Sequence, residues 1–206
     1  MNILAIGAHP DDIEYGCGGT LLKLRKQKDN NIYFFVATHG DFSGGPEVRI
    51  DEQKNAADSL GVKKLYWGGF MDTQLEMNRD LIGEIEFVIK RCSPDIIFVN
   101  YPDDTHQDHR ALAECTIVAS RYCRKVLFYE DYTSQNYDPD IFVDIGDVLE
   151  EKVGLLGIHK SQVERVYPTS LDMVESVRAI ANFRGFQAKV KYAEGFCALR
   201  YLMDMD

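Results

Sequence analysis

Short apolar runs alternate along this chain with longer segments of helical periodicity, and this alternation is the strongest constraint on its fold. Each run has the length of one buried strand, and the segments between the runs are long enough for a helix. In residues 79–92, for example, Leu81, Ile85 and Val88 fall on one helical face. Alternation of this kind predicts a mainly parallel sheet with helices on both faces. We expect strands at residues 3–6, 32–37, 64–67, 96–100 and 126–129, and helices at 19–28, 51–60, 79–92 and 109–122.

The last third of the sequence is more helical, at roughly 146–159 and 171–185, and it ends in a strand near residues 196–201. No internal repeat, low-complexity segment or Pro/Ser-rich linker divides the chain. Its 206 residues are enough to bury one substantial core. The sequence therefore predicts a single α/β domain spanning residues 1–206, with a Rossmann-like, mainly parallel sheet.

Charge and composition narrow the range of partners. The chain has the composition of a globular protein, and its net charge of −10 argues against binding nucleic acid or an anionic membrane. No stretch approaches the roughly 18 apolar residues of a transmembrane helix, and the N-terminus lacks a hydrophobic signal region. Five scattered cysteines without a C-x-x-C pair are typical of a reduced protein. We therefore expect a cytoplasmic protein that binds a small molecule; a homo-oligomer is compatible with the sequence.

A histidine and two carboxylates, His9, Asp11 and Asp12, are crowded together directly after the first apolar run. Adjacent carboxylates repel each other, and a divalent cation removes that repulsion. A second cluster, Asp103-Asp104-Thr105-His106-Gln107-Asp108-His109, follows the run at 96–100. Ligands of open α/β sheets gather beyond the carboxyl ends of the strands. The two clusters therefore predict a metal site assembled from two strand ends.

His9, Asp12 and His109 would supply two imidazoles and one carboxylate. Catalytic zinc keeps three protein ligands of these types and one open position for water. The same set suits non-haem Fe(II), so the ligand types alone leave both Zn²⁺ and Fe²⁺ open. Asp11 then remains beside the bound water, where a general base belongs, and His106 remains on the other side.

Simpler explanations exist for either cluster alone. Pairs of Asp before a helix are often caps that interact with the helix dipole, and an isolated surface histidine usually has no catalytic role. The presence of both clusters at matching strand ends favours the metal site. A nucleotide-binding Rossmann enzyme is another alternative, but Gly16-Cys17-Gly18-Gly19 lacks the G-x-G-x-x-G spacing after the first strand.

The chain also resembles the LmbE/PIG-L family of zinc-dependent N-acetylglucosaminyl deacetylases. Its first cluster is similar to the family's A-H-P-D-D-E motif, and His106-Gln107-Asp108-His109 is similar to its H-P-D-H. Ile13 followed by Glu14 resembles the P-D-D-[IV]-E variant of bacillithiol-type deacetylases. Similar segments continue in the family's order over nearly the whole chain: Arg49-x-x-Glu52, Ala56-Ala57, Leu60-Gly61-Val62, Met71-Asp72, Lys152 with His159-x-Ser161-Gln162, and Tyr192–Phe196. The segment Thr38-His39-Gly40-Asp41 departs from the family pattern and changes the mouth of the site.

The resemblance implies a role for each candidate residue. It implies that His9, Asp12 and His109 bind zinc, that Asp11 is the general base and that His106 faces the developing oxyanion. It places Asp108 behind an imidazole, which such partners commonly orient. Arg49 and Asp72 fall where the family contacts the sugar or its substituent. Arg49 could instead pair with a nearby acid, and Asp72 could be an ordinary turn residue.

Together these features predict a zinc-dependent hydrolase that removes the N-acetyl group from an N-acetylated amino sugar or its conjugate, such as a nucleotide sugar or a glycosylated small molecule, and releases acetate. Either Asp11 or His106 could protonate the leaving amine. Because a guanidinium suits phosphate or carboxylate, Arg49 favours an anionic group on the sugar. The alternative is a metal-containing sugar-binding or regulatory protein without turnover, which the intact Asp11 and His106 disfavour.

Overall fold

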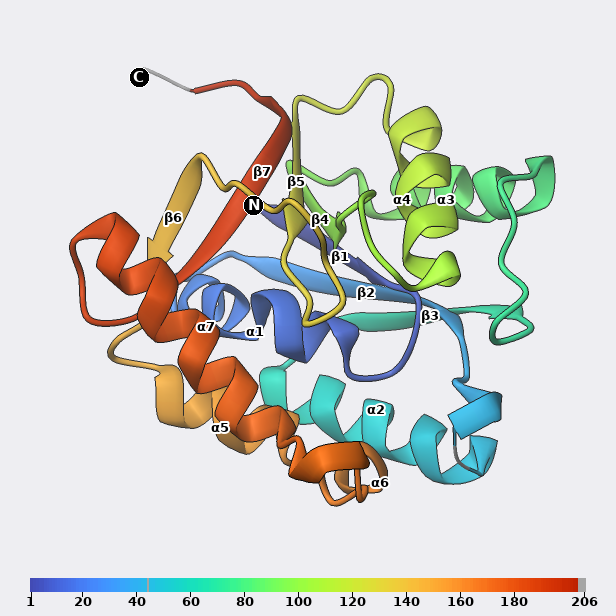
Figure 1. Ribbon diagram of the computed structural model, residues 1–206. Coiled ribbons are helices and arrows are strands. Elements are labelled where there is room, and N and C mark those ends of the chain that lie inside the picture. The colour runs from blue at the N-terminus through green and yellow to red at the C-terminus, as the bar shows by residue number, and fades with distance from the viewer. Residues whose placement is uncertain (44, 204–206) are drawn as a thin grey trace.

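Seven strands form one sheet in the order β3-β2-β1-β4-β5-β7-β6 in the computed structural model, which describes residues 1–43 and 45–203 (Figure 1). The strands are β1 (Asn2–Gly7), β2 (Asn31–Thr38), β3 (Lys64–Phe70), β4 (Ile96–Asn100), β5 (Lys125–Tyr129), β6 (Ile141–Asp144) and β7 (Ala193–Tyr201). The α-helices are α1 (Asp12–Arg25), α2 (Pro46–Leu60), α3 (Arg79–Cys92), α4 (Gln107–Ala119), α5 (Leu149–Leu156), α6 (Lys160–Val163) and α7 (Met173–Ala188). Two 3-10 turns are η1 (Asp41–Ser43) and η2 (Pro168–Ser170).

The first five strands are parallel, and β1 lies between β2 and β4. Ile3 of β1 pairs with Ile32 on one side and with Ile96 on the other. The chain moves outward from β1 to β3 and then returns to place β4 on the opposite side of β1. The crevice beyond the carboxyl ends of β1 and β4 is therefore the topological switch point, where open α/β sheets bind their ligands. At the other edge β7 and β6 are antiparallel, so the expected mainly parallel sheet is confirmed.

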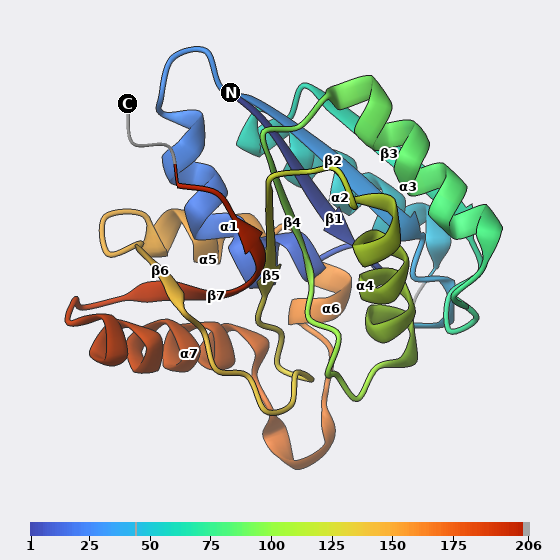
Figure 2. The same ribbon diagram turned by 90° about the horizontal axis from the view of Figure 1, so that it is seen from above.

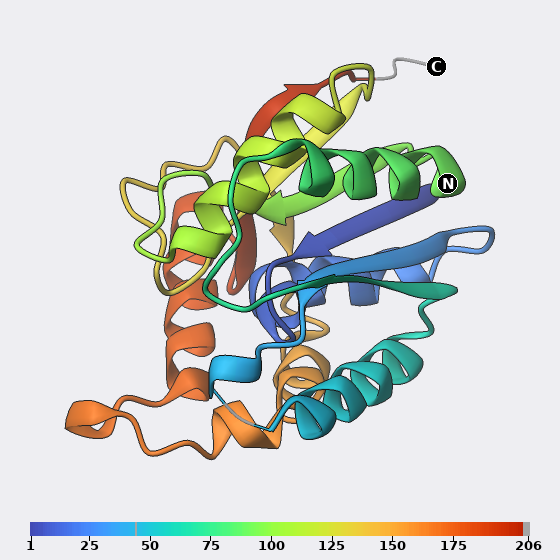
Figure 3. The same ribbon diagram turned by 90° about the vertical axis from the view of Figure 1, so that its right-hand side faces the viewer.

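Two apolar cores lie on opposite faces of the sheet, and helices cover both of these faces (Figure 3). Side chains of a strand point alternately to the two faces. Ile3 therefore packs with Leu21 of α1 in the core that α2 and α5 also cover, whereas Leu4 packs with Leu81 of α3 and Leu112 of α4. The helix α7 lies along the antiparallel edge formed by β6 and β7 (Figure 2). Helices on both faces of the sheet are thus confirmed.

Helix α1 begins at Asp12, although the sequence predicts a helix only from residue 19. Glycine disfavours helices by about 1 kcal/mol per residue, so the glycines between these positions resemble a turn. The packing of α1 requires them nevertheless. A Cβ at Gly16 would lie 2.1 Å from the ring of Tyr129, and a Cβ at Gly19 would lie 2.9 Å from Ile145. Close approach to Tyr129 of β5 and to Ile145 outweighs helix propensity, and Asp12 lies in the first turn of the resulting helix α1.

Other boundaries differ less from the prediction. Helix α2 begins at Pro46 rather than at residue 51, because a proline in the first turn lacks only an N–H that would have no helical partner there. No strand is predicted at β6, because three partly buried residues and one exposed residue at a sheet edge carry little pattern. Within the described residues, no helix is long and apolar enough to cross a membrane.

Candidate metal centre and active site

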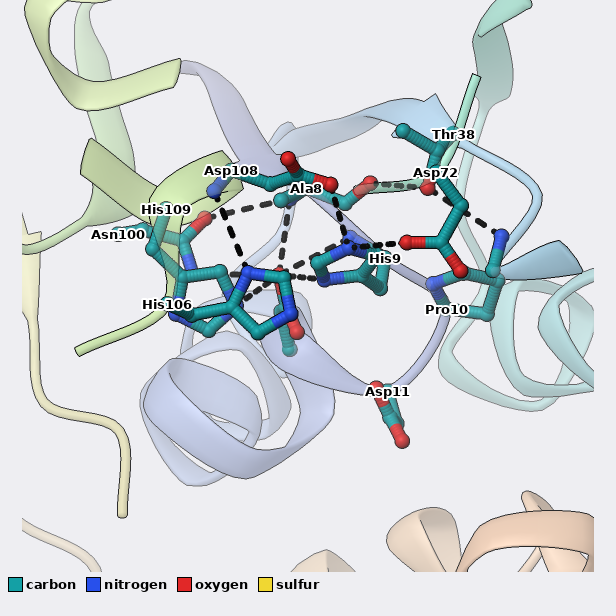
Figure 4. A network of polar contacts seen from close by, with 12 residues as sticks. Ala8, His9, Pro10, Asp11, Thr38, Asp72, Asn100, His106, Asp108 and His109 are labelled. Carbon is teal, nitrogen blue, oxygen red and sulfur yellow. Dashed lines mark hydrogen bonds and ion pairs between the residues drawn. The ribbon is translucent and has the colours of Figure 1, made fainter. Parts of the chain in front are cut away.

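The two clusters predicted from the sequence meet at the switch point (Figure 4). His9 and Asp12 follow β1, whereas His106 and His109 lie at the start of α4, after β4. Asp72, which follows β3, joins them. These five residues line a pocket of about 320 Å³.

Asp12 closes the turn between β1 and α1. Its Oδ2 accepts hydrogen bonds from the backbone N–H groups of Ala8 (2.8 Å) and His9 (3.0 Å) and from the side-chain amide of Asn100 (3.1 Å). The same oxygen lies 3.7 Å from His9 Nδ1 and 3.5 Å from His109 Nε2. Asp12 is therefore fixed in position between one nitrogen atom of each imidazole.

The other nitrogen atom of each imidazole contacts a carboxylate behind it. His9 Nε2 lies 3.0 Å from Asp72 and 3.1 Å from Asp108, and His109 Nδ1 lies 3.2 Å from Asp104. Metal-binding histidines commonly donate their second N–H to a carboxylate in this way, which fixes the tautomer and the ring orientation. His9 Nδ1 and His109 Nε2 are thus left for a metal ion, and with Asp12 they fit the donor set of zinc or non-haem Fe(II).

His106 lies against both of these imidazoles, with ring centroids 4.6 Å from His9 and 4.7 Å from His109. Its Nδ1 accepts a hydrogen bond from the backbone N–H of Asp108 (3.2 Å). In the neutral ring the proton is therefore on Nε2, which can donate. Ligand atoms in three groups of the described residues lie close enough together to hold a metal ion: His9, His106 and His109; His9, Asp72 and Asp108; and Asp12, His109 and Asp131.

The charges of the cluster compensate one another. Burial disfavours the imidazolium of His9, but hydrogen bonds with Asp108, Asp12 and Asp72 outweigh burial and raise the pKa of His9 well above its usual value. Burial also opposes charge on His109, but its carboxylate neighbours raise its pKa to about 10. Burial acts against ionised Asp12 too, yet His109 and His9 hold the pKa of Asp12 well below its usual value. The surrounding carboxylates thus favour positive charge at both imidazoles, and a bound divalent cation would supply that charge instead.

Asp11 precedes α1 in a backbone conformation with a φ of 101°, and its side chain caps no helix N–H. A positive φ costs a non-glycine residue about 1–3 kcal/mol, so surrounding contacts must hold it. Asp11 Oδ1 lies 3.3 Å from Arg49 Nη2, and the Asp11 N–H donates to Gln53 Oε1 at 3.3 Å. Burial raises the pKa of Asp11 to about 6, while Arg49 acts in the opposite direction.

Arg49 and Asp72 both line the pocket, but each also contacts the protein itself. The Arg49 guanidinium donates to the carbonyl oxygens of Pro10 (2.5 Å) and Gly40 (3.1 Å) in addition to its ion pair with Asp11. Asp72 accepts a hydrogen bond from the backbone N–H of Phe42 (2.9 Å) while it contacts His9. Burial opposes ionisation of Asp72, but His9 and Phe42 lower its pKa to about 2. The predicted substrate contacts thus also organise the pocket wall.

Several residues of the site received no role from the sequence. Asp104 belongs to the second acidic cluster, but only the structure shows that it contacts His109. Asp131 follows β5 at the same edge of the sheet, so the strand-end rule could have found it. Asn100 is the last residue of β4 and could have been found in the same way. Gln53 lies in the middle of α2, where no sequence signal separates it from other polar helix residues.

The His/Asp cluster at the switch point of this Rossmann-like fold presents donor atoms that could hold a metal ion. Residues 4–120, more than half of the chain, match the PIG-L family, described as GlcNAc-PI de-N-acetylase, and the protein belongs to that family. The resemblance to the LmbE/PIG-L family inferred from the motifs is confirmed, whereas the likeness to its bacillithiol-type variant stays a prediction.

Relatives over most of the chain are deacetylases. The diacetylchitobiose deacetylase of Thermococcus kodakarensis is 32% identical over an alignment 225 positions long, gaps included; the alignment covers 94% of this chain and 81% of the relative. The crystal structure of the N,N'-diacetylchitobiose deacetylase of Pyrococcus horikoshii superposes with a TM-score of 0.83 at 26% identity, covering 96% of this chain and 83% of that one. The 4-carboxy-2-hydroxymuconate hydratase GalB of Pseudomonas putida shares the fold alone, with a TM-score of 0.81 at 20% identity over 100% of this chain and 98% of that one.

Proposed function

We propose that this protein is a zinc-dependent N-deacetylase that hydrolyses the acetamide of an N-acetylated amino sugar or its conjugate to acetate and the free amine. One observation carries the proposal: Asp12 Oδ2 lies 3.7 Å from His9 Nδ1 and 3.5 Å from His109 Nε2 beside the pocket, and a carboxylate lies behind each imidazole. Membership of a de-N-acetylase family supports the reaction type. A cytoplasmic location is part of the proposal and is supported by the five free cysteines.

In this proposal His9, Asp12 and His109 hold the zinc ion. A zinc ion held by these residues would lower the pKa of a water molecule towards roughly 7 and would polarise the substrate carbonyl. Asp11, at the pocket wall, accepts the proton of the attacking water. His106 donates from Nε2 to the developing oxyanion, because its Nδ1 is already engaged by the backbone of Asp108. The leaving amine takes its proton from Asp11 or His106.

Substrate recognition would involve the remaining pocket residues. Asp72 is the proposed acceptor for a sugar hydroxyl, since its carboxylate lines the pocket beside His9. Arg49 also lines the pocket and is the proposed contact for an anionic group on the sugar. Its guanidinium contacts Pro10, Gly40 and Asp11 at the same time.

Acetate release tests this proposal. The purified protein is incubated with N-acetylglucosamine, its phosphate, aryl and alkyl N-acetylglucosaminides and N-acetylated disaccharides, before and after chelation and zinc restoration. We expect zinc-dependent acetate release from at least one of these sugars. If every sugar binds but none releases acetate, the protein is a sugar-binding or regulatory member of the family. Absence of both binding and release rules out an amino-sugar substrate.

A further inference from the structure

We infer that Arg49, Gln53 and Glu14 form a clamp that holds Asp11 in its unfavourable backbone conformation and directs its carboxylate to the pocket. They are positioning residues for the proposed general base, so this inference rests on the proposed function. Arg49 and Gln53 are one turn apart on α2, and Glu14 is in the first turn of α1. We call these three residues the Asp11 clamp.

The clamp contacts the Pro10-Asp11 dipeptide at three points. Arg49 Nη2 donates to the carbonyl oxygen of Pro10 at 2.5 Å and lies 3.3 Å from Asp11 Oδ1. Gln53 Oε1 accepts the N–H of Asp11 at 3.3 Å. Arg49 is 3% exposed and Gln53 is fully buried, so water does not compete for these contacts. Both sides of the Pro10-Asp11 peptide bond are therefore held by one face of α2.

Glu14 decides which way the Gln53 amide points. An ionised carboxylate can only accept hydrogen bonds, whereas an amide offers both a donor and an acceptor. Gln53 Nε2 donates to Glu14 Oε1 at 2.7 Å, which leaves Gln53 Oε1 for the Asp11 N–H. Glu14 is fully buried, and its other oxygen lies 3.5 Å from His159 Nε2. Glu14 thus closes a ring of contacts from Asp11 through Gln53 and back to α1.

The clamp is separate from the residues that would bind the metal. The Asp12 carboxylate is fixed by Ala8, His9 and Asn100, whereas the Gln53 side chain bonds to Asp11 and Glu14. Gln53 is also absent from the described lining of the pocket. Loss of the Gln53 contact should therefore release Asp11 while metal binding and substrate binding persist. Such a separation distinguishes positioning of the base from general support of the fold.

The test uses Gln53→Leu, Gln53→Glu and the exchange Glu14→Gln/Gln53→Glu in the zinc-loaded enzyme. Displacement of a reacting group by 1 Å can cost about a hundredfold in rate, so we expect Gln53→Leu to lower kcat roughly 10- to 100-fold at unchanged KM and zinc content. Gln53→Glu places two carboxylates face to face and lowers kcat as well. In the exchange variant the amide introduced at position 14 donates to the carboxylate introduced at position 53, whose second oxygen accepts from Asp11. Its kcat should return to within a few-fold of the parent enzyme.

Ala56→Gly is the matched control, because Ala56 is buried on the same helix and its methyl group packs in the apolar core. It should lower the melting temperature and leave kcat unchanged. Parent-like kcat in Gln53→Leu, or an exchange variant no better than Gln53→Glu, would overturn the clamp. Failure of the proposed function can be told apart from failure of the clamp, because the parent protein then releases no acetate. In that case a crystal structure of Gln53→Leu tests the clamp: a negative φ at Asp11 supports it, and a retained positive φ refutes it.

Discussion

At the scale of single residues, His106 and His109 are neighbours with different surroundings. His109 is buried between Asp12 and Asp104, whereas His106 is partly exposed and held by the backbone of α4. We expect His109→Ala to lose most of the bound metal. His106→Ala should keep the metal and lose activity about a hundredfold or more, the usual cost of an oxyanion donor. Metal content and acetate release are measured for both variants. Equal metal loss in the two would mean that His106 is a ligand, which the close grouping of His9, His106 and His109 allows.

Asp11 provides a second test at this scale. Asp11→Asn keeps an oxygen that can accept from Arg49, so it removes the proton acceptor and spares the clamp. We expect zinc content and KM to persist and kcat to fall about 100- to 10,000-fold, the range of general acid–base groups. Steady-state kinetics with zinc analysis measures this. Activity within a few-fold of the parent would place the base elsewhere.

At the scale of elements, the packing of α1 on β5 makes its own prediction. Tyr129 fills the space beside Gly16. Its hydroxyl oxygen lies 2.8 Å from the Ile6 carbonyl oxygen and 3.0 Å from Asn100 Oδ1, so its single proton can go to either acceptor, and the Asn100 amide in turn donates to Asp12. Gly16→Ala should destabilise the protein by about 1–3 kcal/mol through overpacking, despite better helix propensity. Gly154→Ala in α5, where a Cβ meets nothing within 4 Å, should stabilise by about 0.5–1 kcal/mol. Urea unfolding measures the change in the free energy of unfolding of both variants. A change of the same sign in both would refute the packing argument.

The same elements show which parts of the candidate site could be predicted from the sequence. His9, Asp12 and His109 could be placed from sequence because strand ends of a parallel sheet meet at one edge, whatever the details of packing. The start of α1 could not be predicted, because its glycines are explained only by the ring of Tyr129. The role of Gln53 could not be predicted either, since it depends on which face of α2 is turned towards Asp11. Short-range pattern thus predicts the donors, and long-range packing decides what holds them.

At the scale of the whole molecule, metal binding would join the two halves of the sheet. A ligand at about 100 times its Kd stabilises the folded state by about 2.7 kcal/mol, and each kcal/mol raises the melting temperature of a chain of this size by about 2–4 °C. We therefore expect zinc to raise the melting temperature of the chelated protein by roughly 5–10 °C. Asp12→Asn should largely abolish the shift. Thermal unfolding with and without zinc measures it, and an equal shift in the variant would mean that zinc acts elsewhere.

The central place of β1 also has a consequence for how the chain is made. Ile3 pairs with Ile96, so one edge of β1 stays open until β4 has left the ribosome. An open apolar strand edge is prone to wrong pairing during synthesis. His9 and Asp12 emerge early, whereas His109 follows β4. Capture of the proposed metal and closure of that edge would therefore belong to the same late step of biogenesis, and a nascent chain halted before β4 would accomplish neither.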